Sequence, residues 1–195
     1  AWEKQKSLVD LIQKERNKNI LVLCEHPSVI TIGRSGKDSN ILTSKEFLKL
    51  QGIDSVEIDR GGDVTLHNPG QLVGYPIFNL TSLKEDLHWF LREIEECIIE
   101  LLLEFGVNSH RIEGLTGVWV DNMRKICAMG LHCSRWVTSH GFALNINNNL
   151  KEFNYIIPCG IKNKEVTSLS KEIGTIVDIN MIKNSCLKIF LNHFD

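Results

Sequence analysis

The longest apolar periodicity in the chain lies between residues 83 and 105. Hydrophobic side chains recur there at intervals of three and four residues, which places them on one face of a helix. They are Leu83, Leu87, Phe90, Leu91, Ile94, Ile98, Leu101, Leu102 and Phe105. Ser82 with Glu85 predicts a capping box at the start, and Gly106 predicts the end. We therefore expect a helix over 83–105 with one buried face.

Shorter runs rich in β-branched residues alternate with polar turns along the rest of the chain. They predict strands over residues 20–26, 29–33, 55–59, 64–67, 71–80, 117–121, 125–133 and 141–147. Further helices are expected over 2–17, from a capping box of Thr43 and Glu46 to Leu50, and over 179–193. Helices and strands are interleaved without internal repeats. This order predicts one α/β domain of the α+β type over residues 1–195, with a mixed, largely antiparallel sheet and flanking helices.

Composition narrows the classes of function. The chain has 195 residues, 24% of them charged, and a formal net charge of −2. A dedicated nucleic-acid-binding protein would usually show a basic stripe, and the basic residues here are scattered among acids. No stretch approaches the ~18 apolar residues of a membrane span. The six cysteines form no C-x-x-C pair, so a reducing compartment is expected rather than a disulfide framework.

Four stretches combine small residues with reactive or hydrogen-bonding side chains. They are RGGDVTLHNPGQL (60–72), KICAMG (125–130), SRWVTSHGFALN (134–145) and IIPCGI (156–161). In the last of these, Cys159 lies between Pro158 and Gly160 at the expected end of an apolar strand. Proline fixes the approach of the chain and glycine leaves the thiol unshielded, which favours an accessible nucleophile. The competing interpretation is one more buried cysteine that only packs.

In this order and spacing the stretches resemble the octanoyltransferase family, also called lipoate-protein ligase B. LCEHPSVITIGR at 23–34 is similar to the first strands of that family, and RGGDVTLHNPGQLVGYPI at 60–77 to its substrate loop, with KICAMG, HGFALNIN and PCGI following. The chain departs at Leu66, where the family usually has an aromatic residue, and at Asn68, where glycine is usual. Both departures bear on the shape of the acyl tunnel. The resemblance covers nearly the whole chain and implies the fold of biotin and lipoate ligases.

The resemblance implies transfer of an octanoyl group to a protein lysine, the first step of lipoate cofactor synthesis. Cys159 would carry the group as a thioester, and Lys125 would be its catalytic partner, as base or as fixed cation. The Gly160 N–H is expected to stabilise the oxyanion. For His67 a structural role is as compatible with the residues as a functional one. The substrate-binding positions implied are Arg60, Gly61, Gly62, Asp63, Val64, Thr65, Leu66, His67, Ala128, Met129, Gly130, Gly141, Phe142 and Ala143.

The partners implied are octanoyl-acyl carrier protein as donor and, as acceptors, the lipoyl domains of 2-oxoacid dehydrogenases or the H protein of glycine cleavage. A monomer is expected, with no cofactor, metal, nucleic acid or membrane. The compartment would be the cytoplasm of a bacterium, or the interior of a mitochondrion or plastid in a eukaryote.

Three other functions stay open from the residues. The first is an ATP-dependent lipoate or biotin ligase of the same fold, which needs a nucleotide site and no cysteine nucleophile. Pro158-Cys159-Gly160 and the acidic Asp63 argue against it. The second is a thioesterase in which His140 or His67 activates Cys159. The third is a module that only docks an acyl carrier or a lipoyl domain, and the presence of both Cys159 and Lys125 argues against that.

Overall fold

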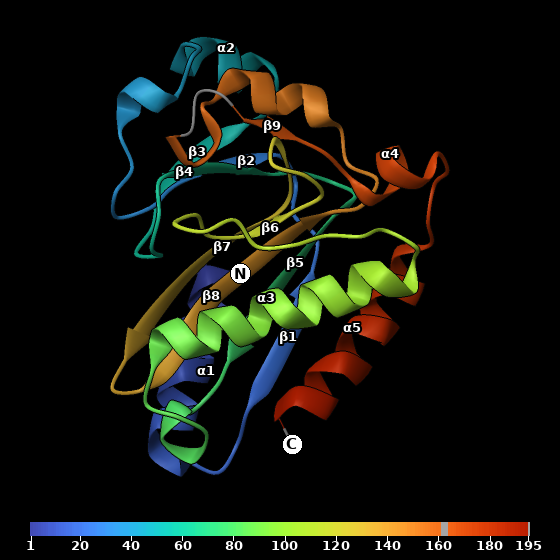
Figure 1. Cartoon of the computed structure of the whole chain (residues 1–195). Coiled ribbons are helices and arrows are strands. Elements are labelled where there is room, and N and C mark those ends of the chain that lie inside the picture. The colour runs from blue at the N-terminus through green and yellow to red at the C-terminus, as the bar shows by residue number, and fades with distance from the viewer. Residues whose placement is uncertain (161–163, 195) are drawn as a thin grey trace.

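Two sheets form the framework of the protein (Figure 1). The computed structural model describes residues 1–160 and 164–194, apart from the side chain of Cys159. The larger sheet has the order β1-β5-β8-β7-β6, formed by Ile20–Cys24, Gln71–Ile77, Val137–Asn145, Arg124–Ser134 and Val118–Trp119. These neighbours are antiparallel, whereas β9 (Glu165–Val166) runs parallel to the start of β7. The smaller sheet has the order β3-β2-β4, formed by Asp54–Glu57, Val29–Ile32 and Val64–His67.

Helices cover both faces of the larger sheet. α3 (Leu87–Glu104) and α5 (Ile179–Phe194) pack on one face, and Figure 1 shows α3 crossing the strands with α5 beside it. α1 (Trp2–Glu15) packs on the other face, against β5 and β8. α2 (Lys45–Leu50) and the 3₁₀ segment η3 (Leu150–Tyr155) close a separate core over the smaller sheet. The remaining short elements are α4 (Leu169–Ile173) and the 3₁₀ turns η1 (Asp38–Asn40), η2 (Leu80–Ser82) and η4 (Pro158–Gly160).

The predicted central helix is confirmed, but its expected start is wrong. α3 begins at Leu87, and the Asp86 side chain accepts from the Trp89 N–H at 2.9 Å. Ser82 instead ends the 3₁₀ turn η2. A similar shift occurs at α2, where Ser44 rather than Thr43 accepts from the Phe47 N–H. In both helices a side-chain oxygen accepts from a first-turn amide, so Asp86, four positions after Ser82, and Ser44, one position after Thr43, take the place of the predicted caps.

The two strands around Asn68-Pro69-Gly70 belong to different sheets. β4 pairs with β2 in the smaller sheet, and β5 pairs with β1 and β8 in the larger one. Asn68 is fully buried and holds the crossing in place, because its amide donates to the Asn149 carbonyl at 2.9 Å. Gly70 supplies the positive φ of 86° that the turn requires. The chain therefore joins the sheets here and leaves a space between them.

Two strand predictions need correction. Residues 156–161 were expected to contain the end of an apolar strand, but Ile156 makes only an isolated bridge to Ile41, and η4 follows. β1 is a half-buried edge strand instead of a buried one. In the described residues, no helix is both long and apolar enough to cross a membrane.

Candidate active site

A cavity of about 670 Å³ lies between the smaller sheet and the face of the larger sheet that carries α1. Thr31 of β2 and Thr65 of β4 line it from one side, and Val73 of β5 and Ala143 of β8 from the other. The start of β7, the 114–116 segment and the first turns of α3 complete the wall. Most of the sequence-predicted site residues meet here: Arg60, Gly61, Gly62, Asp63, Thr65, His67, Lys125, Ala128, Met129, Gly130, Gly141, Phe142 and Ala143.

The Arg60-Gly61-Gly62 segment is fixed over the larger sheet by its own backbone. The Gly61 N–H donates to the Leu131 carbonyl at 2.9 Å, and the buried Arg60 guanidinium donates to the Thr31 carbonyl at 2.7 Å. A Cβ at Gly130 would lie 2.5 Å from the Gly61 carbonyl oxygen, so only glycine allows the loop to approach β7 this closely. The loop is thereby a rigid part of the cavity wall.

Asp63 connects this loop to the segment that contains Cys159. Its carboxylate accepts from the Asn40 amide at 2.6 Å and from the Lys37 N–H at 3.2 Å. The Asn40 carbonyl in turn accepts from the Ile157 N–H at 2.7 Å, and a Cβ at Gly160 would lie 2.6 Å from the Asp63 carboxylate. Asp63 therefore packs directly against the Pro158–Gly160 turn.

The backbone of Pro158–Gly160 forms the 3₁₀ turn η4. The side chain of Cys159, the predicted nucleophile, lies outside the described residues. Gly160 has a φ of 69°, and its N–H donates to the Ile157 carbonyl at 3.1 Å. The amide expected to stabilise an oxyanion is thus engaged in the turn, and it would have to leave that bond to serve a substrate.

Lys125 lies at the start of β7 between two edge strands, paired with Trp119 of β6 and Val166 of β9. Only 6% of the residue is exposed, and it lines the cavity. Its Nζ lies 4.7 Å from the centroid of the fully buried Trp119 ring. The prediction that this amine points into the site from the beginning of a strand is consistent with this placement.

Small residues on β7 and β8 have two different roles. Val73, Ala143 and Ala128 face one another across β5, β8 and β7, so their short side chains leave room in the cavity. Gly130 and Gly141 also line the cavity, but the space that a Cβ would occupy at each of them is already filled. A Cβ at Gly141 would lie 2.1 Å from the Gly74 carbonyl oxygen, as one at Gly130 would clash with Gly61. Protein backbone occupies the space that those glycines free.

Alternation along β4 turns two predicted positions away from the cavity. Val64 and Leu66 are fully buried in the core of the smaller sheet, because neighbouring side chains on a strand point to opposite faces. The Leu66 and Asn68 departures from the family pattern therefore lie outside the cavity lining. Phe142 and Met129 line the cavity and also pack against the core of the larger sheet, where the Phe142 ring stacks on Phe190 of α5 with centroids 5.8 Å apart.

His67 is held in one protonation state. Burial lowers its pKa to about 4, although the bond to Gln71 opposes the shift. The Gln71 amide nitrogen donates to the Leu66 carbonyl and to Asn145, so its oxygen accepts from His67 Nδ1 at 2.8 Å. At neutral pH the ring is uncharged, the proton sits on Nδ1, and Nε2 keeps a lone pair.

Sequence reasoning missed His26 and Tyr75, which also line the cavity. His26 Nε2 lies 2.7 Å from the Tyr75 hydroxyl, and the His26 and His67 rings are 5.8 Å apart. Burial lowers the pKa of His26 and raises that of Tyr75, so both are neutral. The available signal was a histidine directly before Pro27 at the end of a strand.

His140 has little freedom to activate a thiol. Its ring Nε2 lies 2.7 Å from an Asp59 carboxylate oxygen, and its backbone N–H donates to the Gln5 side-chain oxygen at 2.7 Å. Burial lowers its pKa, and Asp59 opposes this shift. The φ of 59° is unusual for a residue other than glycine.

Comparison with known proteins bears on what this cavity does. The model of the lipoyl protein ligase A/B catalytic domain matches residues 1–191. An octanoyltransferase of Cytophaga hutchinsonii is 49% identical over 193 residues, covering 95% of this chain and 79% of that protein. The structure of a bipartite lipoate protein ligase and its E2 lipoyl domain from Thermoplasma acidophilum matches with a TM-score of 0.77 at 17% identity, covering 97% of this chain and 78% of that one.

A biotin protein ligase of Aquifex aeolicus, solved with biotin and ATP, matches with a TM-score of 0.55 at 20% identity, covering 84% of this chain and 69% of that one. The expectation of a mixed α/β fold shared with lipoate and biotin ligases is therefore confirmed.

Proposed function

Because the chain belongs to the octanoyltransferase family, within the lipoyl protein ligase A/B catalytic domains, we propose that it moves an octanoyl group from acyl carrier protein to a lipoyl-domain lysine through a thioester on Cys159. The chain is an acyltransferase, and octanoyl transfer in lipoate synthesis is its activity. The observation that supports the route is the cavity, which runs from the small residues of β5, β7 and β8 to Lys125. Burial of an acyl chain there is worth about 0.8 kcal/mol per methylene.

The first step exchanges one thioester for another. The Cys159 sulfur bonds to the acyl carbon, and the bond from that carbon to the carrier sulfur breaks. The thiol proton goes to the Lys125 amine and then to the departing carrier sulfur. A thiol attacks only as thiolate, so a group that removes its proton is required.

The second step forms the amide. The acceptor lysine nitrogen bonds to the acyl carbon, the carbon–sulfur bond to Cys159 breaks, and the amine proton returns to Cys159 through Lys125. Conversion of a thioester to an amide is downhill, so the reaction needs no ATP. The acceptors that we propose are the lipoyl domains of 2-oxoacid dehydrogenases and the glycine cleavage H protein. We further propose that the enzyme acts as a monomer, in the cytoplasm of a bacterium or inside a eukaryotic organelle.

The covalent step is tested by intact-mass spectrometry after exposure to octanoyl-acyl carrier protein. The wild type should gain one octanoyl group that hydroxylamine removes. Cys159→Ala should fold and gain none, while Cys133→Ala, which removes a partly exposed thiol on β7, should be acylated as the wild type. An adduct that persists in Cys159→Ala would reject the nucleophile.

Lys125→Arg separates the base from the fixed cation. Arginine keeps the charge but stays protonated, so it cannot shuttle a proton. We expect loss of most turnover in both acylation and discharge, measured in single-turnover reactions. Near-normal rates in both steps would leave Lys125 as an electrostatic partner only.

A further inference from the structure

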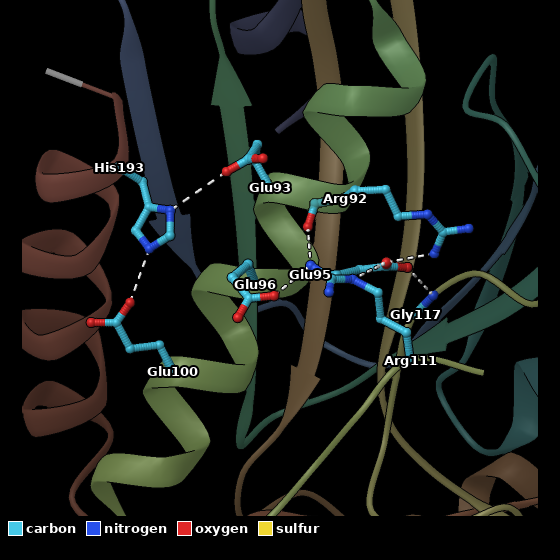
Figure 2. A network of polar contacts seen from close by, with 8 residues as sticks. All are labelled: Arg92, Glu93, Glu95, Glu96, Glu100, Arg111, Gly117 and His193. Carbon is cyan, nitrogen blue, oxygen red and sulfur yellow. Dashed lines mark hydrogen bonds and ion pairs between the residues drawn. The ribbon is translucent and has the colours of Figure 1, made fainter. Parts of the chain in front are cut away.

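Glu95 is a fully buried carboxylate in the middle of α3 that the proposed reaction does not use. Figure 2 shows two arginines around it: Arg92 Nη1 donates to Oε2 at 2.6 Å, and Arg111 Nε donates to the same oxygen at 3.1 Å. A buried charge is costly unless it is paired and hydrogen-bonded. These two bonds account for one carboxylate oxygen and leave the other for a different partner.

The second oxygen holds the backbone next to Lys125. Oε1 accepts from the Gly117 N–H at 2.8 Å, a contact that joins α3 to the segment before β6 (Figure 2). Gly117 has a φ of 109°, and a Cβ there would lie 2.4 Å from the Cys127 carbonyl and 3.5 Å from Lys125 Cε. The Gly117 backbone therefore packs against the lysine side chain.

The residues on either side of Gly117 contact the surroundings of Lys125 in two places. Before Gly117, Leu115 and Thr116 line the cavity. After it, Trp119 places its ring beneath Lys125 Nζ. A movement at Gly117 would thus change both the wall next to the amine and the ring that it rests on.

We propose that Glu95 is a positioning residue for the transfer reaction: by holding the Gly117 amide, it fixes the segment that orients the Lys125 amine toward the acyl group. This inference rests on the proposed function, because it assigns Glu95 a role through Lys125. Displacement of a reacting group by about 1 Å can cost roughly a hundredfold in rate, so a distant anchor has a measurable effect.

Glu96 offers a matched control on the same helix. Its carboxylate pairs with Arg111 Nη2 at 2.6 Å, but its side chain is 47% exposed. Glu96→Gln therefore removes a charge from the same arginine and leaves the Glu95–Gly117 bond in place.

The test is a double-mutant cycle on single-turnover acylation by octanoyl-acyl carrier protein. In Glu95→Gln the side-chain amide has one oxygen and one NH₂ group. The arginines and the Gly117 N–H are all donors, so the NH₂ group must face one of these donors and that hydrogen bond is lost. We expect this variant to acylate about tenfold slower or worse, with KM for the donor nearly unchanged, and Glu96→Gln to stay within about twofold of the wild type. In a Lys125→Met background, Glu95→Gln should cause no further loss.

Thermal unfolding identifies variants that fail to fold. If Glu95→Gln fails to fold, Glu95→Asp replaces it in the cycle. Aspartate keeps the negative charge near the arginines but is one methylene shorter, so its carboxylate no longer reaches the Gly117 N–H. The same slowing is expected. A normal rate in a folded Glu95 variant would overturn the inference, and so would an equal loss in the presence and absence of Lys125. A Lys125→Met enzyme with the wild-type rate would instead reject the proposed role of Lys125, whatever the Glu95 variants do.

Discussion

Single side chains decide how much room the cavity offers. Ala143 and Ala128 lie opposite each other on β8 and β7, and Val73 faces Ala143 from β5. Gly130 and Gly141, in the next positions along, are covered by the backbone of Gly61 and Gly74. A substitution at an alanine would therefore intrude on the cavity, whereas one at a glycine would disrupt the protein itself.

Ala143→Phe should shorten the preferred acyl chain or block acylation, because a ring added to a 4% exposed position has only the cavity to enter. The measurement is acyl-enzyme formation with a series of carrier thioesters from butyryl to decanoyl, read by intact mass. Ala143→Ser, of similar volume, should keep the wild-type profile. An unchanged profile in a folded Phe variant would place Ala143 outside the acyl path.

His67 should make the protein less stable in mild acid. Its pKa falls from 6.5 to about 4 on folding, so the unfolded chain binds the proton first as the pH falls. Stability linked to His67 is complete above the unfolded value and is lost between about pH 6.5 and pH 4, to a total of about 3 kcal/mol. Urea unfolding across this range should show a shallower pH dependence for His67→Gln. Equal slopes would contradict the lowered pKa of His67.

At the scale of elements, β4 divides its side chains between two environments. Thr65 and His67 face the cavity, while Val64 and Leu66 pack with Leu48 of α2 and its neighbours. The strand is thus a wall shared by the site and the smaller core. Substitutions on its two faces should have separable consequences.

Leu66→Ala should lower the free energy of unfolding by about 2–5 kcal/mol, the usual cost of deleting a buried leucine side chain. The acyl chain-length profile should stay as in the wild type, because the deleted atoms face the other core. Chemical denaturation and the thioester series measure the two quantities. A changed profile without a loss of stability would put Leu66 on the cavity side.

At the scale of the whole molecule, the cavity exists because the chain crosses between sheets at Asn68-Pro69-Gly70. Loops from both sheets then meet there, with Asp63 joining the Arg60–Gly62 segment to Asn40 and to the Pro158–Gly160 turn. A biotin protein ligase solved with biotin and ATP has a similar fold. A ligase and an acyltransferase of this fold are therefore distinguished by whether the reaction is driven by ATP or by a thioester.

The purified chain should octanoylate a lipoyl domain from octanoyl-acyl carrier protein without nucleotide, since the thioester already supplies the driving force. Transfer in apyrase-treated reactions, followed by the mass of the lipoyl domain, measures this. Octanoic acid with ATP and Mg²⁺ should yield no product. Product formed only from the free acid and ATP would make the chain a ligase.

The sequence alone determined features that depend on local patterns. The apolar face of α3 could be read from the spacing of Phe90, Ile94 and Ile98, because helical periodicity requires no knowledge of distant residues. The motifs around Lys125 and the Arg60–Gly62 loop likewise marked segments that the fold brings to one cavity. The sheet was predictable as mixed and largely antiparallel from the order of strands and helices.

Only the tertiary structure decided which strands share a sheet and which small residues leave space. Gly130 and Ala128 are both small residues on the same strand, and nothing in the sequence separates their roles. In the fold, the carbonyl of Gly61, far away along the chain, occupies the space that a Cβ of Gly130 would need. Glu95 interrupts an apolar pattern as a surface residue would, and only the fold brings Arg111 and the Gly117 amide to it. Hydrogen bonds and close contacts between remote segments depend on the path of the whole backbone, and no local pattern of residue types encodes that path.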